Sequence, residues 1–359
     1  MKIIKTEKNH NIPENVILFD IETTGLSAQS SYVYLIGMMM NENGKCVLTQ
    51  LFADNYSEEK ELVSTFLTFL KPGTLLVSYN GTTFDVPYLN RKFKRHAIMY
   101  EIASENTLDL YTTTKRVKKY LELENLKQVN LEKAAGFMRS DRFTGEELTE
   151  VYAEYAGISK LAEVTKRPDV IEKSDALMNS MLLHNHDDLE GLACIFERSG
   201  IEDISKGLLA PHIDTNEYEL SFLFDRPLFA APFEANTGLF WINNGTRNSE
   251  LVVSLVKKEL KYFFSDYKNY TFVIDRGYAM HSSVVSGMAK ENLRKCKKED
   301  AFIRKTGDFV LIPKEMADYC GENGIKLFKE AYASKELYAE VSDMKGSLAD
   351  YAAFLLKHL

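Results

Sequence analysis

The N-terminal part of the chain alternates between short apolar runs and amphipathic segments of helical period. The apolar runs are rich in β-branched and aromatic residues, and they predict buried strands at 16–22, 31–40, 45–53 and 74–79. The turn sequence Asn41-Glu-Asn-Gly44 separates the second run from the third, so the first three strands should form an antiparallel meander. The pattern also predicts helices at 57–70 and 86–95 and a further short strand at 106–111.

Beyond residue 110 the pattern is mainly helical as far as Ser199, and the last helix is expected from Ala176 to Arg198. Gly200, Gly207 and Pro211 then interrupt the chain and indicate a boundary. We therefore expect one domain over residues 1–205 and a second, smaller α+β domain over residues 206–359. In the second domain the pattern predicts strands at 217–224, 238–242 and 270–275, a hairpin at 301–312, and helices at 249–264, 279–297, 314–341 (broken at 321–324) and 347–359.

Two carboxylates stand at the end of the first predicted strand. Only Ile21 separates Asp20 from Glu22, and alternate residues of a strand point to the same face of its sheet. The turn sequence Thr23-Thr24-Gly25 ends the strand. Carboxylates held side by side repel each other, and a hard divalent cation such as Mg²⁺ is the usual group between them. A solvated strand end is the alternative explanation.

Polar residues also stand at the start of one predicted helix and on the apolar face of another. Asp85 begins the helix after the fourth strand, where a carboxylate stabilises the helix dipole by about 0.3–1 kcal/mol, so capping alone would explain it. His184 and Asp188 lie one turn apart on the apolar face of the last helix, where a polar group is costly unless paired. A structural hydrogen bond between them is the alternative to a functional site. Asp187 is rotated toward a more polar side, so Asp188 is the carboxylate expected to point inward.

These separate signals are consistent with one constellation. Together, Asp20, Glu22, Asp85 and Asp188 would form a cage for two divalent ions, which activate a water and stabilise the leaving oxygen of a phosphodiester. His184 would then orient or deprotonate the attacking water.

The motifs resemble those of the DnaQ-like DEDD superfamily of 3′–5′ exonucleases, whose domain has an RNase H-like fold. The similar segments are Phe19-Asp-Ile-Glu-Thr-Thr-Gly-Leu26 for the first motif, Asn80-Gly-Thr-Thr-Phe-Asp85 for the second and His184-Asn-His-Asp-Asp188 for the third. With Asn125-Leu-Lys-Gln and Arg142-Phe-Thr-Gly-Glu between them, the series most resembles the YprB-type branch over residues 12–200. The resemblance implies an α/β fold with a mixed sheet flanked by helices, two Mg²⁺ or Mn²⁺ ions, and hydrolysis of single-stranded DNA or RNA.

The resemblance also assigns roles to individual residues. The implied metal ligands are Asp20, Glu22, Asp85 and Asp188. The terminal nucleotide would lie against Thr23, Gly25 and Leu26, and Asn80 and Phe84 would line the same cleft. His184 departs from the pattern, because a third motif with this spacing to Asp188 usually begins with Tyr, and the His version is usually one residue longer. The departure leaves open whether His184 is the general base, and Asp187 remains a second candidate ligand.

Composition limits the compartment and the partner. The net charge of −8 disfavours a protein that wraps duplex DNA without specificity, although a local basic patch can coexist with an acidic site. The four cysteines form no CxxC motif, the N-terminus lacks the apolar core of a signal peptide, and no apolar run reaches the ~20 residues of a membrane span. We therefore expect a cytoplasmic protein. Basic clusters at 91–95 and 115–119 would follow a nucleic-acid backbone, or they are solvated helix faces.

The second domain contains no catalytic motif that we recognise. Residues 290–305 hold seven basic and three acidic side chains, and several aromatic residues precede them between 263 and 272. Such a set can hold single-stranded nucleic acid by stacking, but buried aromatics with solvated charges are the preferred explanation. The whole sequence favours a metal-dependent 3′–5′ exonuclease. Two alternatives stay open: a nucleic-acid-binding module that does not cleave, and a phosphodiesterase acting on small nucleotides.

Overall fold

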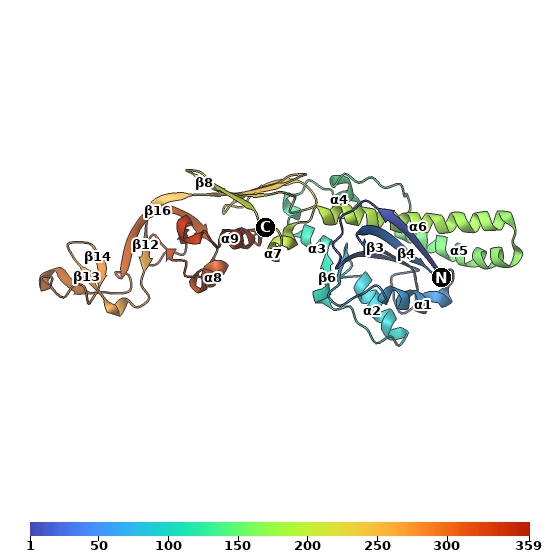
Figure 1. Ribbon diagram of the computed structural model, residues 1–359, viewed down its shortest axis with the longest axis horizontal. Helices are drawn as coiled ribbons and strands as arrows, with labels where there is room; N and C mark the ends of the chain where they lie inside the picture. The colour runs from blue at the N-terminus through green and yellow to red at the C-terminus, as the bar shows by residue number, and fades with distance from the viewer. The chain divides into compact units, whose positions relative to one another are not determined.

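The computed structural model describes residues 1–359, the side chain of Ser205 excepted. It separates into two compact units (Figure 1): residues 1–200 with 227–232 form the first, and residues 201–226 with 233–359 form the second. Each unit is described by itself. Among the described helices, none has both the length and the apolar composition that crossing a membrane requires.

A six-stranded mixed sheet forms the centre of the first unit. Its strand order is β1-β4-β3-β2-β5-β6, in which β5 runs parallel to both of its neighbours and the other pairs are antiparallel. The strands are β1 (Lys2–Lys8), β2 (Val16–Thr23), β3 (Val33–Glu42), β4 (Lys45–Phe52), β5 (Leu75–Ser78) and β6 (Thr107–Asp109).

The predicted antiparallel meander is confirmed as β2, β3 and β4. Asn43 and Gly44 turn the chain between β3 and β4 with φ values of 56° and 85°, as a two-residue hairpin turn of type I′ requires. Strand β1 is an addition that the pattern does not predict. It lies at the edge of the sheet and most of its side chains are exposed, so it carries little apolar signal.

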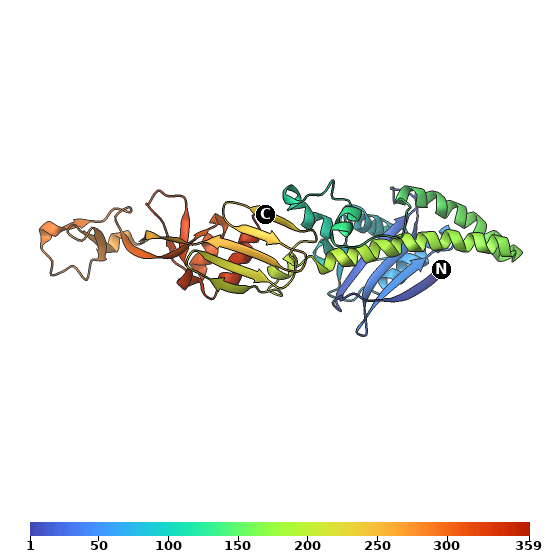
Figure 2. The same cartoon turned by 90° about the horizontal axis from the view of Figure 1, so that it is seen from above.

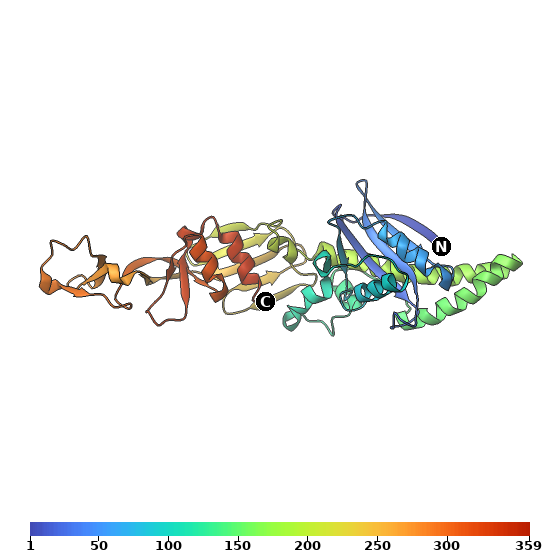
Figure 3. The ribbon, with the colours of Figure 1, turned by 90° about the horizontal axis from the view of Figure 1, so that it is seen from below.

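Helices cover both faces of this sheet. On one face, α1 (Glu59–Leu67) and α2 (Asp85–Arg95) pack Phe66, Leu89 and Phe93 against β2 and β3 (Figure 3). Across the other face lies α6 (Pro168–Glu197), which buries Leu189 and Leu192 against β2, β3 and β4 (Figure 2). The remaining helices of this unit are α3 (Leu110–Lys115), α4 (Gln128–Ala134) and α5 (Gly145–Thr165), and α5 pairs with α6 as a helical hairpin.

The expected α/β class is confirmed: the first unit is a mixed sheet flanked by helices, and the second is built on further β-sheets. The prediction divides the chain at residue 205, whereas the first compact unit ends at residue 200. Segment 227–232 also belongs to the first unit. Within that segment, Ala230 belongs to the core on the α6 face of the sheet.

The second unit contains three antiparallel sheets. Their strand orders are β7-β8-β11-β10-β9, β12-β16-β18-β17 and β14-β13-β15. The strands of the first of these sheets are β7 (His212–Thr215), β8 (Glu219–Phe224), β9 (Phe233–Asn236), β10 (Trp241–Asn244) and β11 (Ser249–Ser254). The other two sheets comprise β12 (Val256–Phe263), β13 (Tyr270–Val273), β14 (Tyr278–His281), β15 (Leu293–Lys295), β16 (Phe302–Ile312), β17 (Leu327–Phe328) and β18 (Leu337–Glu340). The helices are α7 (Ile201–Ser205), α8 (Ala317–Glu322) and α9 (Leu348–Leu356).

Several predictions for the second unit are wrong. The expected helices at 249–264 and 279–297 are strands and turns, and the expected helix at 314–341 is reduced to α8 followed by β17 and β18. Along β11, buried and partly exposed positions alternate with a period of two, which the helical interpretation overlooks. The final helix, α9, is present within the predicted range 347–359.

The predicted hairpin at 301–312 is also wrong, because these residues form the single strand β16. Gly307 suggested a turn, but it lies within the strand opposite Lys258. A Cβ atom at Gly307 would lie 2.7 Å from Glu340 Oε1, so the glycine makes room for that side chain.

Candidate active site

The end of β2 carries Asp20 and Glu22 on one face of the sheet. Asp20 pairs with Gly37 of β3, and the register shifts between Glu22 and Thr23. A bulge of this kind bends a strand and changes the direction of the residues that follow. Glu22 is only 8% exposed, so its carboxylate has little access to solvent.

Asp85 reaches the same place as the first residue of α2, directly after the turn that follows β5. Its Oδ1 atom accepts a hydrogen bond of 3.2 Å from the backbone N–H of Ile21, the residue between the two β2 carboxylates. Asp109, at the end of β6, holds the turn by accepting hydrogen bonds from the Asn80 N–H (2.8 Å) and the Thr82 hydroxyl (2.5 Å). Neighbouring parallel strands thus fix the turn, and the turn fixes Asp85.

His184 and Asp188 approach the β2 carboxylates from α6. The His184 Nε2 atom lies 3.2 Å from Asp188 Oδ2 and 3.9 Å from Glu22 Oε1. Glu22, His184 and Asp188 each offer one ligand atom, and these three atoms all lie within 4.8 Å of one another. The structure therefore brings together the predicted residues of the first and third motifs, and Asp85 joins them through Ile21.

The cluster has a strong excess of negative charge. Burial, and then the charges of Asp188 and Glu22, raise the pKa of Asp20 well above its ordinary value. Burial, followed by Asp188 and Asp85, does the same to the pKa of Glu22. Burial also raises the pKa of Asp85 to about 7, against the two backbone hydrogen bonds that lower it. Carboxyl groups with raised pKa values gain most from a bound cation.

Asn185 supports the cluster and is absent from the sequence prediction. Its side-chain amide donates a 2.9 Å hydrogen bond to Asp20 Oδ2, and its own Oδ1 accepts one of 3.1 Å from Gln50. Asn185 is fully buried, and a Cβ atom at Gly37 would lie 2.0 Å from its Oδ1. The glycine of β3 therefore leaves the space through which α6 reaches Asp20.

Arg139 is the cation next to the cluster, and sequence analysis does not find it either. Its Nη2 atom lies 2.6 Å from Asp188 Oδ1, and its Nε atom donates a 2.5 Å hydrogen bond to the buried Glu132 of α4. A Cβ atom at Gly191 would lie only 2.1 Å from Glu132 Oε1, so the glycine leaves room for the Glu132 side chain. Arg139 thus links α4 to the inward carboxylate of α6.

Asp141 positions His184, since Asp141 Oδ2 lies 2.6 Å from the Nδ1 atom of the imidazole. Asp187 anchors the same loop: its Oδ2 atom accepts hydrogen bonds from the backbone N–H groups of Ser140 (2.6 Å) and Asp141 (2.8 Å). Asp187 is 3% exposed, because the side of α6 that it faces is covered by this loop and not by solvent. Its Oδ2 atom is thus engaged with the loop by two hydrogen bonds.

Only one of these supporting residues left a signal in the sequence. Asn185 is a polar residue on an apolar helix face, the same signal that identified its neighbour His184. Arg139 and Asp141 lie in the loop between α4 and α5, where no periodicity indicates which side chain points inward.

The predicted substrate-contacting residues lie at the end of β2 and in the segments that follow β2 and β5. The Thr23 hydroxyl donates a 3.0 Å hydrogen bond to the carbonyl oxygen of Gly25, and Leu26 is 86% exposed. Gly25 has a φ of 155°, and the Tyr88 hydroxyl of α2 donates to its carbonyl oxygen at 3.3 Å. The two residues predicted from the second motif are Asn80 and Phe84. Asn80 is exposed and has a φ of 62°, and the half-buried Phe84 ring packs on Tyr88, with ring centroids 5.4 Å apart.

The basic cluster at 91–95 is not a continuous cationic face. Lys92 is fully buried, and its ammonium group lies 2.8 Å from Glu59 Oε1, so it cannot contact a nucleic-acid backbone. Glu59 also accepts a 2.8 Å hydrogen bond from the Val33 N–H, which ties α1 and α2 to β3. The exposed members are Arg91, Lys94 and Arg95.

Comparison with known proteins agrees with the fold. Residues 17–199 match the family model of the RNase H superfamily, which is just over half of the chain. The chain belongs to the RNase H superfamily. A search of curated proteins gives no match.

Solved structures align at low identity. The exonuclease domain of Nibbler from Aedes aegypti aligns at 14% identity and a TM-score of 0.28, covering 50% of this chain and 79% of that one. The family B DNA polymerase of Pyrobaculum calidifontis aligns at 13% identity and a TM-score of 0.36, covering 96% of this chain and 56% of that one. Exonuclease I of E. coli in complex with a dT13 oligonucleotide aligns at 13% identity and a TM-score of 0.29, covering 64% and 54%. The alignment thus spans little more than half of the polymerase and of exonuclease I.

Proposed function

We propose that this chain is a metal-dependent nuclease of the DEDD type that removes nucleotides from the 3′ end of single-stranded DNA or RNA. One observation carries the proposal: ligand atoms of Glu22, His184 and Asp188 converge within 4.8 Å, beside two further carboxylates whose pKa values are raised. A purely structural network would pair such buried acids with cations, and the acids here outnumber the one nearby arginine.

The donor set fits hard divalent cations. Carboxylate oxygens are the preferred ligands of Mg²⁺ and Mn²⁺, and Asp20, Glu22, Asp85 and Asp188 would hold two such ions. When bound, the ions would activate a water and stabilise the leaving oxygen of the phosphodiester.

His184 is the residue proposed to accept a proton from the attacking water. A carboxylate only accepts hydrogen bonds, so the Nδ1 atom of His184 carries the proton that it donates to Asp141 at 2.6 Å. In the neutral imidazole the Nε2 atom, which faces Glu22 and Asp188, would then be the atom that accepts the proton of the water. Asn185 and Arg139 orient Asp20 and Asp188 around it.

The loop after β2 is proposed to contact the terminal nucleotide. Leu26 projects an apolar side chain into solvent beside the cluster, which suits contact with a base. Thr23 and Gly25 would present backbone groups to the terminal phosphate, and Asn80 and Phe84 would line the same cleft. None of these contacts distinguishes DNA from RNA, since that choice depends on contact with the 2′-hydroxyl.

A time course on 5′-labelled single-stranded DNA and RNA tests the proposal, using wild type and Asp188→Ala with Mn²⁺ or with EDTA. A ladder that shortens from the 3′ end, absent with EDTA and absent in the variant, is the expected result. Intact strands in every lane with a retained gel shift would instead support a binding module. Cleavage of a chromogenic phosphodiester without cleavage of the strand would support an enzyme for small nucleotides.

A further inference from the structure

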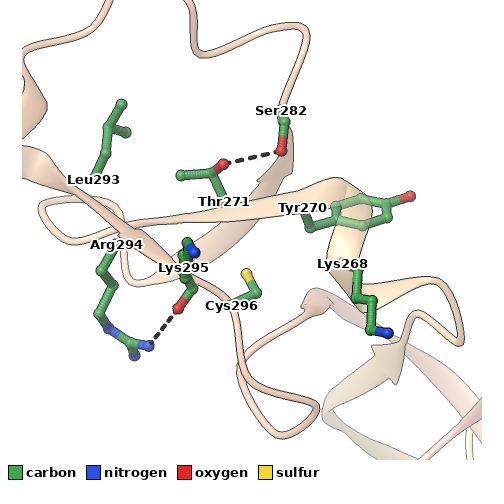
Figure 4. A pocket seen from close by; sticks show the side chains of 8 residues that line it. All are labelled: Lys268, Tyr270, Thr271, Ser282, Leu293, Arg294, Lys295 and Cys296. Carbon is green, nitrogen blue, oxygen red and sulfur yellow. Dashed lines mark hydrogen bonds between the residues drawn. The ribbon is translucent and has the colours of Figure 1, made fainter.

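A shallow pocket of about 490 Å³ lies in the second unit, on the three-stranded sheet β14-β13-β15 (Figure 4). Lys268 contributes from the short 3-10 helix Tyr267–Asn269, Tyr270 and Thr271 from the start of β13, and Arg294 and Lys295 from β15. The two strands pair so that Thr271 is opposite Lys295. The pairing brings the cationic strand β15 beside the aromatic strand β13, with Lys295 and Thr271 on one face of the sheet and Tyr270 on the other.

The pocket is cationic in a chain whose net charge is −8. Three of its lining residues are basic, and none of its lining residues is acidic. Lys268 and Lys295 are exposed, and neither has an ion-pair partner among the described residues. Arg294 is held in place instead: its Nη2 atom donates a 2.9 Å hydrogen bond to Asp300, and its guanidinium lies 4.0 Å from the centre of the Phe272 ring. Two unpaired ammonium groups thus remain for an anionic ligand.

An aromatic surface accompanies these charges. The Tyr270 ring stacks on the Phe264 ring, with centroids 4.0 Å apart and planes inclined by 11°. Tyr270 is only partly buried, and it lines the pocket beside Lys268 (Figure 4). A ring supported on one face by another ring is a rigid platform on which a planar base can continue the stack.

We propose that this pocket binds single-stranded nucleic acid, with phosphates at Lys268 and Lys295 and a base stacked at Tyr270. Ammonium groups track a phosphodiester backbone without sequence preference, and stacking adds the affinity for unpaired bases. The choice of nucleic acid over another polyanion rests on the proposed nuclease function, because that function supplies single strands as the substrate. This proposal replaces the explanation preferred from the sequence alone, in which the aromatic residues are buried in the core and the charged residues are only solvated.

Binding of a fluorescein-labelled dT20 oligonucleotide to the full chain in EDTA tests the pocket without cleavage. The test variant is Lys268→Glu/Lys295→Glu, and the matched control is Lys290→Glu/Lys335→Glu, which reverses two exposed lysines outside the pocket lining. We expect the affinity of the test variant for dT20 to fall at least tenfold. The slope of log K against log salt concentration should become shallower by about 1.4, since each of the two lost phosphate contacts contributes ~0.7. The control should change affinity by less than threefold. Equal losses in both variants, or no loss in either, would overturn the site.

A second pair of variants tests the stack. Tyr270→Leu should weaken dT20 binding by about 5- to 150-fold, the range for one stacked base, while Tyr270→Phe should bind as wild type does. An abasic strand of the same length should not distinguish Tyr270→Leu from wild type. If Tyr270→Leu weakens both strands equally or neither, base recognition fails and the site is at most a polyanion surface. Pocket-dependent binding without any nuclease activity would overturn the proposed function alone, and nuclease activity with unaffected binding in all pocket variants would overturn this site alone.

Discussion

The Nδ1 atom of His184 lies 2.6 Å from the Oδ2 atom of Asp141, and the two residues are 43 positions apart in the sequence. His184 belongs to the long helix α6, whereas Asp141 belongs to the loop that precedes α5. Asp187, on α6 itself, fixes that loop through two backbone hydrogen bonds. The orientation of the imidazole is therefore set by a loop that its own helix holds in place.

Replacing Asp141 by asparagine tests this relationship. In Asp141→Asn the side-chain amide can donate to Nδ1, which would leave the proton on Nε2 and remove the base. We expect the single-turnover cleavage rate to fall by roughly 10²- to 10⁴-fold with little change in oligonucleotide affinity. Asp175→Asn makes the same chemical change at an exposed position of α6 and should cleave at the wild-type rate. Equal rates for the two variants would show that Asp141 does not orient a base.

The hydrogen bond from Asn185 to Asp20 should matter for metal affinity. Asn185→Leu keeps the branched shape beside Gly37 but removes the amide that donates to Asp20 Oδ2 at 2.9 Å. Loss of such an outer contact typically costs 10- to 100-fold in metal affinity, so the Mn²⁺ concentration for half-maximal activity should rise by about that factor. The midpoint is measured by metal titration of the cleavage rate. An unchanged midpoint would mean that Asp20 needs no support from α6.

Two glycines of the helical hairpin should respond to alanine in opposite directions. A Cβ atom at Gly191 would lie 2.1 Å from Glu132 Oε1, so Gly191→Ala should displace the link from Glu132 to Arg139 and destabilise the fold by about 1–3 kcal/mol. At Gly157, in the interior of α5, a Cβ atom would meet nothing within 4 Å, and alanine should stabilise by about 0.5–1 kcal/mol. Urea unfolding measures both. Similar shifts for the two variants would contradict the packing described for α4 and α6.

The periodicity of the sequence predicted the central strands of the first unit and the helix that carries the candidate site. Apolar runs located its central strands, and the polar residues His184 and Asp188 on an apolar helix face marked the candidate site. It failed where exposure hides the signal, as in β1, and where a loop supplies the side chain, as with Arg139 and Asp141. In the second unit, short strands with only a few buried positions carry too little period-two signal to be distinguished from amphipathic helices.

Stability of the metal-free protein should depend on pH through Asp85. Folding raises the pKa of this carboxyl from 3.8 to about 7, chiefly because the group is buried. Its contribution to stability is therefore fully present below pH 4 and is lost as the pH rises through about 7. In EDTA, raising the pH across this range should lower the Tm of wild type relative to the Tm of Asp85→Asn. Adding Mg²⁺ at pH 7 should raise the Tm of wild type more than that of the variant. A difference in Tm that stays constant with pH would contradict the raised pKa.

If the acidic cluster is a two-metal centre, its metal content can be counted directly as the number of Mn²⁺ ions bound at saturation. Electron paramagnetic resonance of free Mn²⁺ gives this number for wild type, for Glu22→Gln and for the control Glu150→Gln, which alters an exposed residue of α5. We expect two ions per chain in wild type and in the control, and fewer in Glu22→Gln together with loss of cleavage. Folded wild-type protein that binds no more Mn²⁺ than Glu22→Gln would contradict this expectation.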